Sequence, residues 1–266
     1  FLARNLHIKQ QTIKSLKKER EMENTIYIAL SRETAVKREM SVIANNLANM
    51  NTTGFKAERM MFVEHLVKSR GGDKIAPTKL AYSRDVAQFT DLREGPIKST
   101  GNPLDVAIKN DGFLIVDTPN GQRYTRNGHL ELSNTGQLVN QQGFAVLSDA
   151  GVPITFAPED TDINISRDGS VSTNNGELGK IRLVQFEKPQ NMEKAGAGLL
   201  KTDEPPADVE SPQIIQGALE TSNVQPIFEL TKMIETQRAF DGVRSFIEKE
   251  DKRQRKMIEQ LAPRRI

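Results

Sequence analysis

Residues 104–154 read LDVAIKNDGFLIVDTPNGQRYTRNGHLELSNTGQLVNQQGFAVLSDAGVPI, and this stretch decides the fold class. Short apolar runs alternate here with turn residues, such as the steps Asn120-Gly121 and Asn127-Gly128. Asn-Gly steps favour positive φ and are a strong signal for tight hairpins. The same texture continues to about Gln185. The sequence therefore predicts an antiparallel β domain over residues 104–187, with many tight hairpins in a bent sheet or small barrel.

The stretches on both sides of this domain have a different composition. Residues 67–103 contain Gly71-Gly72, Pro77 and Gly95-Pro96, and residues 188–222 contain four further prolines. Proline and glycine at this density interrupt regular structure. We expect both stretches to be extended, weakly regular connectors.

A helix is predicted before the first connector, over residues 25–50. Its apolar residues step by 4, 3, 4 and 3, which is the heptad seam of a coiled coil. These residues are Val36, Met40, Ile43, Leu47 and Met50. The Asn- and Thr-rich turn that follows contains Gly54, which can supply a left-handed cap. We expect residues 22–66 to form the N-terminal helix and turn.

A second long helix is predicted over residues 226–261, within a C-terminal segment 223–266. Pro226 suits a first helical turn, and Gly242 is the one residue after it that weakens the helix. One apolar stripe contains Ile227, Leu230 and Ile234. An adjoining stripe contains Met233, Phe240, Val243 and Ile247.

Together these segments predict an α+β fold. Long N- and C-terminal helices, similar to those of coiled coils, would pair around the central antiparallel β domain. Isolated amphipathic helices are marginal in water, so such ends gain stability by packing with each other or with other subunits. Head-to-tail contacts that do not close a ring build a tube or filament. The residues alone thus favour a structural protein that assembles with its neighbours.

Composition excludes several other classes. The chain has 266 residues, no Cys and 36% apolar residues, and its mean hydropathy is −0.53. Without Cys there is no disulfide framework and no thiolate nucleophile or ligand. No run approaches the ~18 apolar residues of a membrane span, and the N-terminus lacks the apolar stretch of a secretory signal.

The charge is concentrated at the N-terminus. Residues 1–21 hold six basic and two acidic residues, a net charge of +4, whereas the whole chain carries +2. Residues 22–266 are therefore mildly acidic, at −2. We expect Met22 to be the biological start and residues 1–21 to be a non-native or disordered basic extension. A solvated tail explains this segment better than a nucleic-acid or lipid patch.

No catalytic or metal-binding pattern is found. His7, His65 and His129 lie far apart in the sequence, and neither a P-loop nor a G-x-S-x-G elbow is present. We therefore expect no enzymatic activity, no catalytic residues, no metal site and no cofactor.

Three segments carry a resemblance to a known family. These are IANNLANMNTTGFKAER at 43–59, the stretch GNPLDVAIKNDGFLIV within 101–154, and ALETSNVQPIFELTKMIETQRAFDGV at 218–243. In this order they resemble the signatures of flagellar axial proteins, the rod and hook family of the bacterial flagellum. The hook subunit is typically longer. The opening MENTIYIALSRETAVKREM is more similar to proximal than to distal rod proteins.

The resemblance implies a structural role in motility. It implies export of the unfolded chain from the cytoplasm by the flagellar type III apparatus, without a cleaved signal peptide. It then implies assembly with self-copies and other rod proteins in the periplasmic rod of the basal body, on the inner-membrane ring side. Nucleic acid and a membrane span are not implied.

The resemblance also implies an assembly interface on the two helices and the turn. Its expected residues are Val36, Met40, Ile43, Asn45, Asn46, Leu47, Asn49, Gly54, Phe55, Leu230, Ile234, Gln237, Arg238, Phe240, Val243 and Ile247. The three Asn side chains would hydrogen-bond across the seam between subunits, although C-terminal capping explains Asn49 equally well. Gly54 and Phe55 would make and anchor the turn, and local packing is the alternative role for Phe55. Arg238 would donate an ion pair between subunits or simply be exposed.

Three alternatives remain at this point. The chain could be the distal rod subunit, or a soluble β-rich module that binds the cell wall. A cell-wall hydrolase with carboxylates grouped in the β domain is a weaker reading, since no second domain of the expected length is present.

Overall fold

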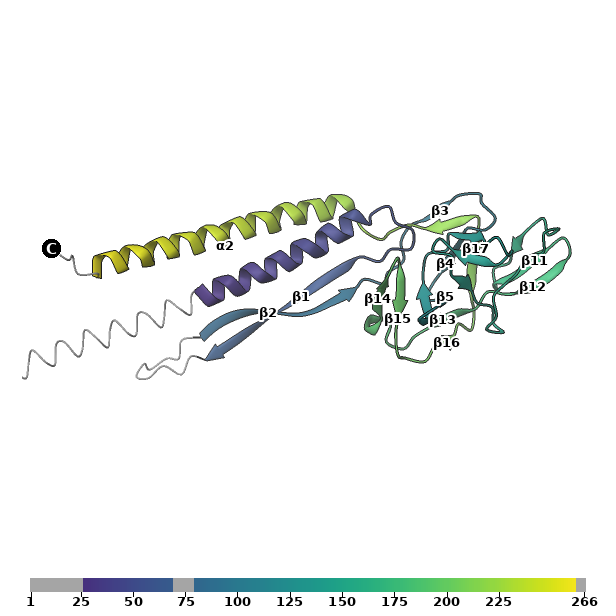
Figure 1. The fold of residues 1–266 in the computed structure, drawn as a ribbon, viewed down its shortest axis with the longest axis horizontal. Helices are drawn as coiled ribbons and strands as arrows, with labels where there is room; N and C mark the ends of the chain where they lie inside the picture. The colour runs from purple at the N-terminus through teal and green to yellow at the C-terminus, as the bar shows by residue number, and fades with distance from the viewer. Residues whose placement is uncertain (1–25, 69–78, 262–266) are drawn as a thin grey trace, which may run out of the picture. The chain divides into compact units, whose positions relative to one another are not determined.

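The computed structural model describes residues 26–68 and 79–261, and side chains are described outside 62–87 and up to residue 259. The proposed extension 1–21 and the last five residues lie outside this range. The fold is α+β, with two helices and many antiparallel strands among the described residues (Figure 1).

The N-terminal helix spans residues 26–48. It ends two residues before the predicted boundary because the amides of Asn49 and Met50 bond to the carbonyls of Asn46 and Leu47, three residues back, at 3.1 and 3.3 Å. This tighter bonding is typical of a last helical turn. The C-terminal helix α2 spans Pro226–Leu261, as predicted.

Along the sequence, all the described strands come between the N-terminal helix and α2. The first group is β1 (Glu58–Lys68), β2 (Lys79–Thr90), β3 (Ile97–Ser99), β4 (Val106–Lys109), β5 (Phe113–Thr118), β6 (Gly121–Thr125), β7 (Leu130–Leu132), β8 (Leu138–Asn140) and β9 (Ala145–Val146). The second group is β10 (Asn164–Ile165), β11 (Ser170–Thr173), β12 (Gly176–Lys180), β13 (Leu183–Gln185), β14 (Glu193–Gly196), β15 (Leu199–Lys201), β16 (Ala207–Asp208), β17 (Gln213–Gln216) and β18 (Ala218–Glu220). A short 3-10 helix, η1, spans Pro189–Asn191.

The largest sheet has nine strands. Seven of them follow the order β14-β15-β6-β5-β9-β8-β7, and β13 pairs with both β5 and β16. At its centre, Ile115 of β5 is opposite Tyr124 of β6. The smaller sheets are β10-β11-β12, β17-β4, β18-β3 and β1-β2.

Strands also occur where the sequence predicts weakly regular connectors. Within 67–103 lie β2, β3 and the end of β1, and within 188–222 lie β14 to β18. Two of these strands pair with strands that are far away in the sequence, because β17 pairs with β4 and β18 pairs with β3. Local composition carries no signal for such partners, which explains the difference. The proposed six-segment division of the chain remains a prediction.

The described chain forms two compact units. The first combines most of the N-terminal helix, the described parts of 60–88 and residues from 227 onward, and the second combines 46–59 and 89–226. The second unit holds both apolar cores. One is centred on Leu114, Val116 and Leu138, and the other on Ile115, Val184 and Phe186.

Candidate functional site

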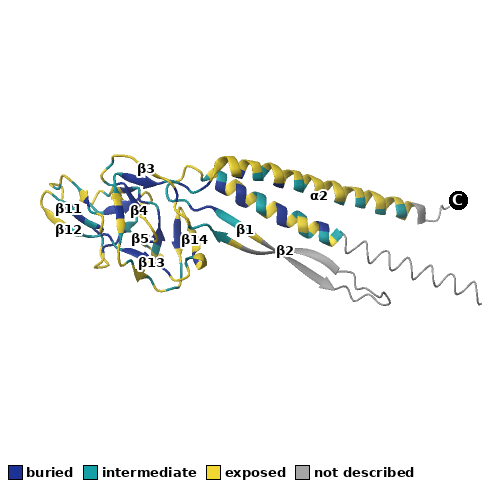
Figure 2. Cartoon of the chain, turned by 180° about the vertical axis from the view of Figure 1, so that it is seen from behind, coloured by how far each residue is buried: buried dark blue, intermediate teal, exposed yellow. Residues whose placement is uncertain are grey.

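The N-terminal helix has one covered face. Figure 2 shows buried residues recurring along this helix. Val36 and Ile43 are 8% and 1% exposed, and Met40 and Leu47 are half-buried. The first four residues of the predicted heptad seam thus lie on the covered side of this helix, whereas Met50 is 37% exposed and lies beyond the helix end. Because Val36 and Ile43 are already buried within the chain, they have almost no surface left for another subunit.

Helix α2 presents two apolar faces of different exposure. Phe240, Val243 and Ile247 are half-buried, as is Met233. The other stripe is open, with Ile227 82%, Leu230 48% and Ile234 53% exposed. Large apolar side chains at regular helical spacing without cover indicate a contact surface.

Contacts within the first unit connect the two helices. The Lys232 ammonium lies 3.3 Å from the Glu39 carboxylate. A mostly apolar groove of about 390 Å³ is lined by both helices, with Ala29 and Arg32 from one and Gly242 and Phe246 from the other. These contacts place residues 28–39 beside 232–246 in antiparallel order.

The three predicted Asn residues differ in what they do. The Asn46 amide donates to the Glu58 carbonyl and accepts from the Glu58 amide, both at 2.8 Å. Asn46 is 1% exposed, so its side chain serves the chain's own backbone and cannot reach across a subunit seam. Asn49 accepts a 3.2 Å bond from the Thr52 hydroxyl in the turn after the helix. Asn45 is exposed.

Gly54 makes the turn that follows. Its φ is +65°, and its amide donates a 2.8 Å bond to the Glu220 carbonyl. A Cβ at this position would lie 2.6 Å from the backbone of Arg126. Glycine is therefore required by both conformation and space.

Phe55 is anchored by a cation. The Lys194 ammonium lies 4.5 Å from the centre of its ring and 2.8 Å from the Glu58 carboxylate. This arrangement supports the anchoring role and ties the turn to strand β14.

Gln237 and Arg238 of the C-terminal signature are exposed, whereas Phe240 is half-buried. The Gln237 amide donates a 3.2 Å bond to Asp241 on the same helix. Arg238 is exposed and pairs with no carboxylate in the described part of the chain.

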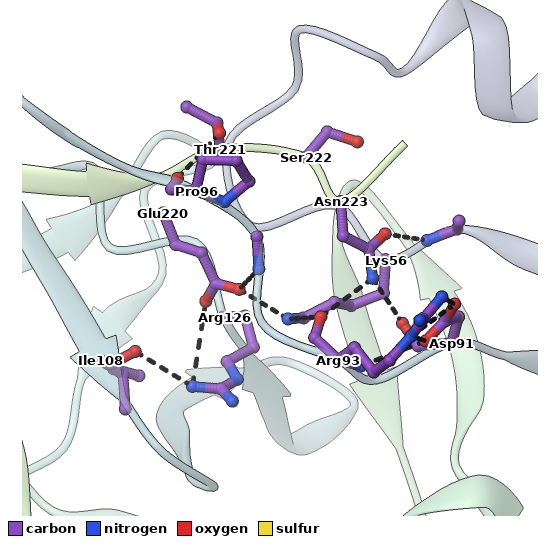
Figure 3. Close-up of polar contacts among 12 residues, drawn as sticks. Lys56, Asp91, Arg93, Pro96, Ile108, Arg126, Glu220, Thr221, Ser222 and Asn223 are labelled. Carbon is purple, nitrogen blue, oxygen red and sulfur yellow. Dashed lines mark hydrogen bonds and ion pairs between the residues drawn. The ribbon is translucent and has the colours of Figure 1, made fainter. Parts of the chain in front are cut away.

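A buried polar cluster joins the two signature segments within the second unit (Figure 3). The Lys56 ammonium lies 2.6 Å from Oε1 of Glu220, and these side chains are 4% and 1% exposed. The same oxygen accepts a 2.8 Å bond from the Gly95 amide, and Lys56 also donates to the Arg93 carbonyl at 2.8 Å. We call Lys56, Arg126, Glu220 and Asn223 the joint cluster.

Arg126 brings a second cation to Glu220. Its Nη1 lies 3.8 Å from Oε2 of Glu220, and its guanidinium donates to the carbonyls of Ile108 and Asn110. Arg126 Nε and Glu220 Oε2 are buried without a hydrogen-bond partner among the described residues. Burial lowers the pKa of Lys56, and its bond to Glu220 opposes this shift.

Asn223 completes the joint cluster with backbone contacts. Its Oδ1 accepts a 2.8 Å bond from the Ala57 amide, and its Nδ2 donates to the carbonyls of Asp91 and Arg93 at 2.8 and 2.9 Å. The chain leaving the N-terminal helix and the chain entering α2 are thus bonded to each other and to the 91–96 segment.

Sequence reasoning did not single out this cluster. Lys56 and Glu220 are separated by 164 positions, so no local pattern relates them. The sequence offers only a weak indication of their pairing. Lys56 and Glu220 each lie inside a signature segment, and each is a charged residue beside a turn or strand.

The described residues contain neither a membrane-spanning helix nor a cluster of metal ligands. Neither helix there is long and apolar enough to cross a membrane. No three His, Asp or Glu side chains there are grouped as metal ligands.

Three family models match the chain in order. Residues 26–56 match the flagella basal body rod protein model, residues 107–173 the D1 domain of flagellar hook protein FlgE/F/G, and residues 215–260 the C-terminal model of flagellar basal body rod FlgEFG proteins.

Relatives match over most of their length. The flagellar basal-body rod protein FlgF of Caulobacter vibrioides is 38% identical over 90% of this chain and 98% of its own. FlgF of Mesorhizobium japonicum is 34% identical over 83% and 90%. FlgG of Bacillus subtilis is 31% identical over 83% and 92%. The chain therefore belongs to the flagellar basal-body rod family, as a structural rod subunit of the FlgF-like type.

Proposed function

We propose that this chain occupies the proximal rod, between the inner-membrane ring and the hook, where it binds copies of itself and other rod proteins. The FlgF relatives support this position. A place in the distal rod is the second candidate, because FlgG of Bacillus subtilis is also 31% identical over 83% of this chain.

We further propose that the two terminal helices pair as in a coiled coil and line the inner tube of the rod. The heptad spacing and the Lys232–Glu39 ion pair support this pairing. The β domain would lie outside the tube and contact neighbouring subunits. Export would proceed through the flagellar type III apparatus before the chain folds, without a cleaved signal peptide.

One observation carries the assembly proposal: the open stripe of Ile227, Leu230 and Ile234 on α2. Full burial of such a side chain from full exposure is worth roughly 1.5–3 kcal/mol, and these three residues still have about half or more of that gain to make. The remaining expected interface residues with open surface, Asn45, Gln237 and Arg238, are proposed to contact neighbouring subunits.

The test combines a deletion with matched substitutions. The gene is deleted in frame, and isolated basal bodies are imaged by electron microscopy. The strain is complemented with residues 22–266, with the full chain, and with full chains carrying Ile234→Asp or Ser245→Asp. Ser245 is an exposed polar residue of the same helix and serves as the control.

We expect the deletion to stop assembly at the inner-membrane ring or a rod stub. The full chain, residues 22–266 and Ser245→Asp should restore filaments, and Ile234→Asp should not. Complete rotating flagella in the deletion strain, with no paralogue present, would remove the rod assignment and favour a cell-wall-binding module. If the Ile234→Asp chain restored filaments, the open stripe on α2 would not be part of the subunit interface.

A further inference from the structure

The chain contains three Asn-Gly steps that the assembly proposal does not use: Asn120-Gly121, Asn127-Gly128 and Asn175-Gly176. In such a step the backbone nitrogen of glycine can attack the Asn side-chain carbonyl, because glycine has no side chain to hinder the approach. The attack requires the Asn side chain to rotate toward the next residue. A hydrogen-bonded amide must first break its bonds, so the fold decides which step reacts.

Asn127 is held firmly. Its Oδ1 accepts bonds from the Thr53 hydroxyl at 2.8 Å and the His129 amide at 3.1 Å. The following Gly128 is packed against the backbone of Val106, where a Cβ would lie 1.7 Å from the carbonyl oxygen. Neither residue of this step can move without opening the β domain.

Asn175 is also held, although it is exposed. Its Nδ2 donates a 2.8 Å bond to Asp160, and its Oδ1 accepts a 3.3 Å bond from Asn174. Its own amide bonds to the Thr173 hydroxyl at 3.3 Å. Both ends of the side chain are therefore engaged.

Asn120 is the exception. It lies in the turn between β5 and β6, where Thr118 pairs with Gly121, and both Asn120 and Gly121 are exposed. No hydrogen bond or ion pair joins its side chain to any residue that the structure describes. The one side-chain atom within 4 Å of the Cβ position of Gly121 is Nη1 of Arg123, at 3.8 Å. Rotation of the Asn120 side chain therefore breaks no hydrogen bond with the described residues.

We propose that Asn120 is the site at which the folded protein deamidates. The Gly121 nitrogen forms a bond to Cγ of Asn120 and loses its proton, the bond from Cγ to Nδ2 breaks, and ammonia leaves. Water then opens the resulting succinimide ring to aspartate or isoaspartate. Each event adds one negative charge beside Arg123 at the tip of this hairpin.

The test ages the purified full chain in neutral buffer and follows all three steps by peptide mapping with mass spectrometry. A parallel sample is kept unfolded in urea. We expect Asn120 in the folded chain to deamidate about tenfold or more faster than Asn127 and Asn175, because those two must open first. In urea the three rates should become similar, since all share the same Asn-Gly chemistry.

An Asn120→Gln variant provides a second measurement. Attack on a glutamine side chain would close a six-membered ring, which forms much more slowly than the succinimide. Ammonia release and the acidic species seen by isoelectric focusing should therefore fall to the background set by the other sites. Asn127 or Asn175 reacting as fast as Asn120 in the folded chain would overturn the proposal. So would a folded chain in which Asn120 stays intact while the unfolded chain reacts.

Discussion

Gly54 has a φ of +65°, and a Cβ on it would lie 2.6 Å from the carbonyl carbon of Arg126. We expect Gly54→Ala to lower the free energy of unfolding by roughly 3 kcal/mol, because the clash adds to the backbone strain. Gly143→Ala is the control, since Gly143 has a φ of +81° with open space around it and should lose only about 1 kcal/mol. Urea unfolding measures both, and equal losses would mean that the close approach to Arg126 is unimportant.

Glu220 is the carboxylate between two buried cations. We expect Glu220→Gln to cost roughly 3–5 kcal/mol, because it leaves Lys56 and Arg126 buried without a counter-charge. Glu193→Gln breaks an exposed pair with Lys201 and should leave the unfolding midpoint nearly unchanged, because water screens such a pair. Chemical unfolding curves of the two variants decide this prediction, and similar midpoints would contradict it.

Asp91, whose backbone carbonyl accepts a bond from Asn223 of the joint cluster, makes the stability of the chain depend on pH. Hydrogen bonds from Arg93 lower the pKa of this carboxyl to about 2, against an ordinary value of about 3.9. A folded pKa below the unfolded one means that the stabilisation is present above pH ~4 and is lost as the pH falls toward 2. Across that window, we expect the unfolding free energy of the native chain to fall more steeply than that of Asp91→Asn. If the unfolding free energies of the two proteins fell equally with pH, Asp91 would not be the source of this pH dependence.

At the scale of elements, α2 is weakened by Gly242. This residue lines the groove, is exposed, and has no atom within 4 Å of its Cβ position. We expect Gly242→Ala to raise the stability of the isolated chain by about 0.5–1 kcal/mol through helix propensity. Thermal unfolding followed by circular dichroism measures this, and a loss of stability would mean that the groove is closed in solution.

Motility provides an independent readout of the same substitution. If a neighbouring subunit packs against the Gly242 backbone, the Ala variant should be more stable yet swim poorly. Unchanged swimming would place the groove away from subunit contacts.

The helices and strands differ in how well the neighbouring sequence alone predicts them. Val36 and Ile43 were identified from their spacing alone, because helical period and burial act together within a few turns. The boundaries of α2 follow from Pro226 and an uninterrupted polar-apolar pattern. The pairings of β17 with β4 and β18 with β3 join residues about a hundred positions apart, so no local pattern could predict them.

The same reasoning explains the outcome for the site. We expect Asn46 to bond to another subunit from its place in the signature. In the structure its side chain instead forms two hydrogen bonds with the backbone of Glu58, which the turn at Gly54 brings back toward the helix. The joint cluster depends on Lys56 and Glu220 meeting in space. Sequence patterns identify surfaces better than they identify the side chains that fasten distant segments.

At the scale of the whole molecule, both apolar cores lie within the second unit. We therefore expect residues 46–59, joined by a short Gly-Ser linker to 89–226, to fold without the helices. Amide dispersion in NMR spectra and a cooperative urea transition would show this. The same protein with Glu220→Gln should unfold at lower urea, and a fragment without cooperative unfolding would contradict the expectation.

The joint cluster also has a mechanical consequence. The amide of Gly54 bonds to the carbonyl of Glu220, and the amide of Asn223 bonds to the carbonyl of Phe55, so the two segments are fastened side by side. A twisting load that reaches either segment is shared by the other through these short bonds. Because these two bonds and the Lys56–Glu220 ion pair join the same two segments, we expect them to resist twisting together.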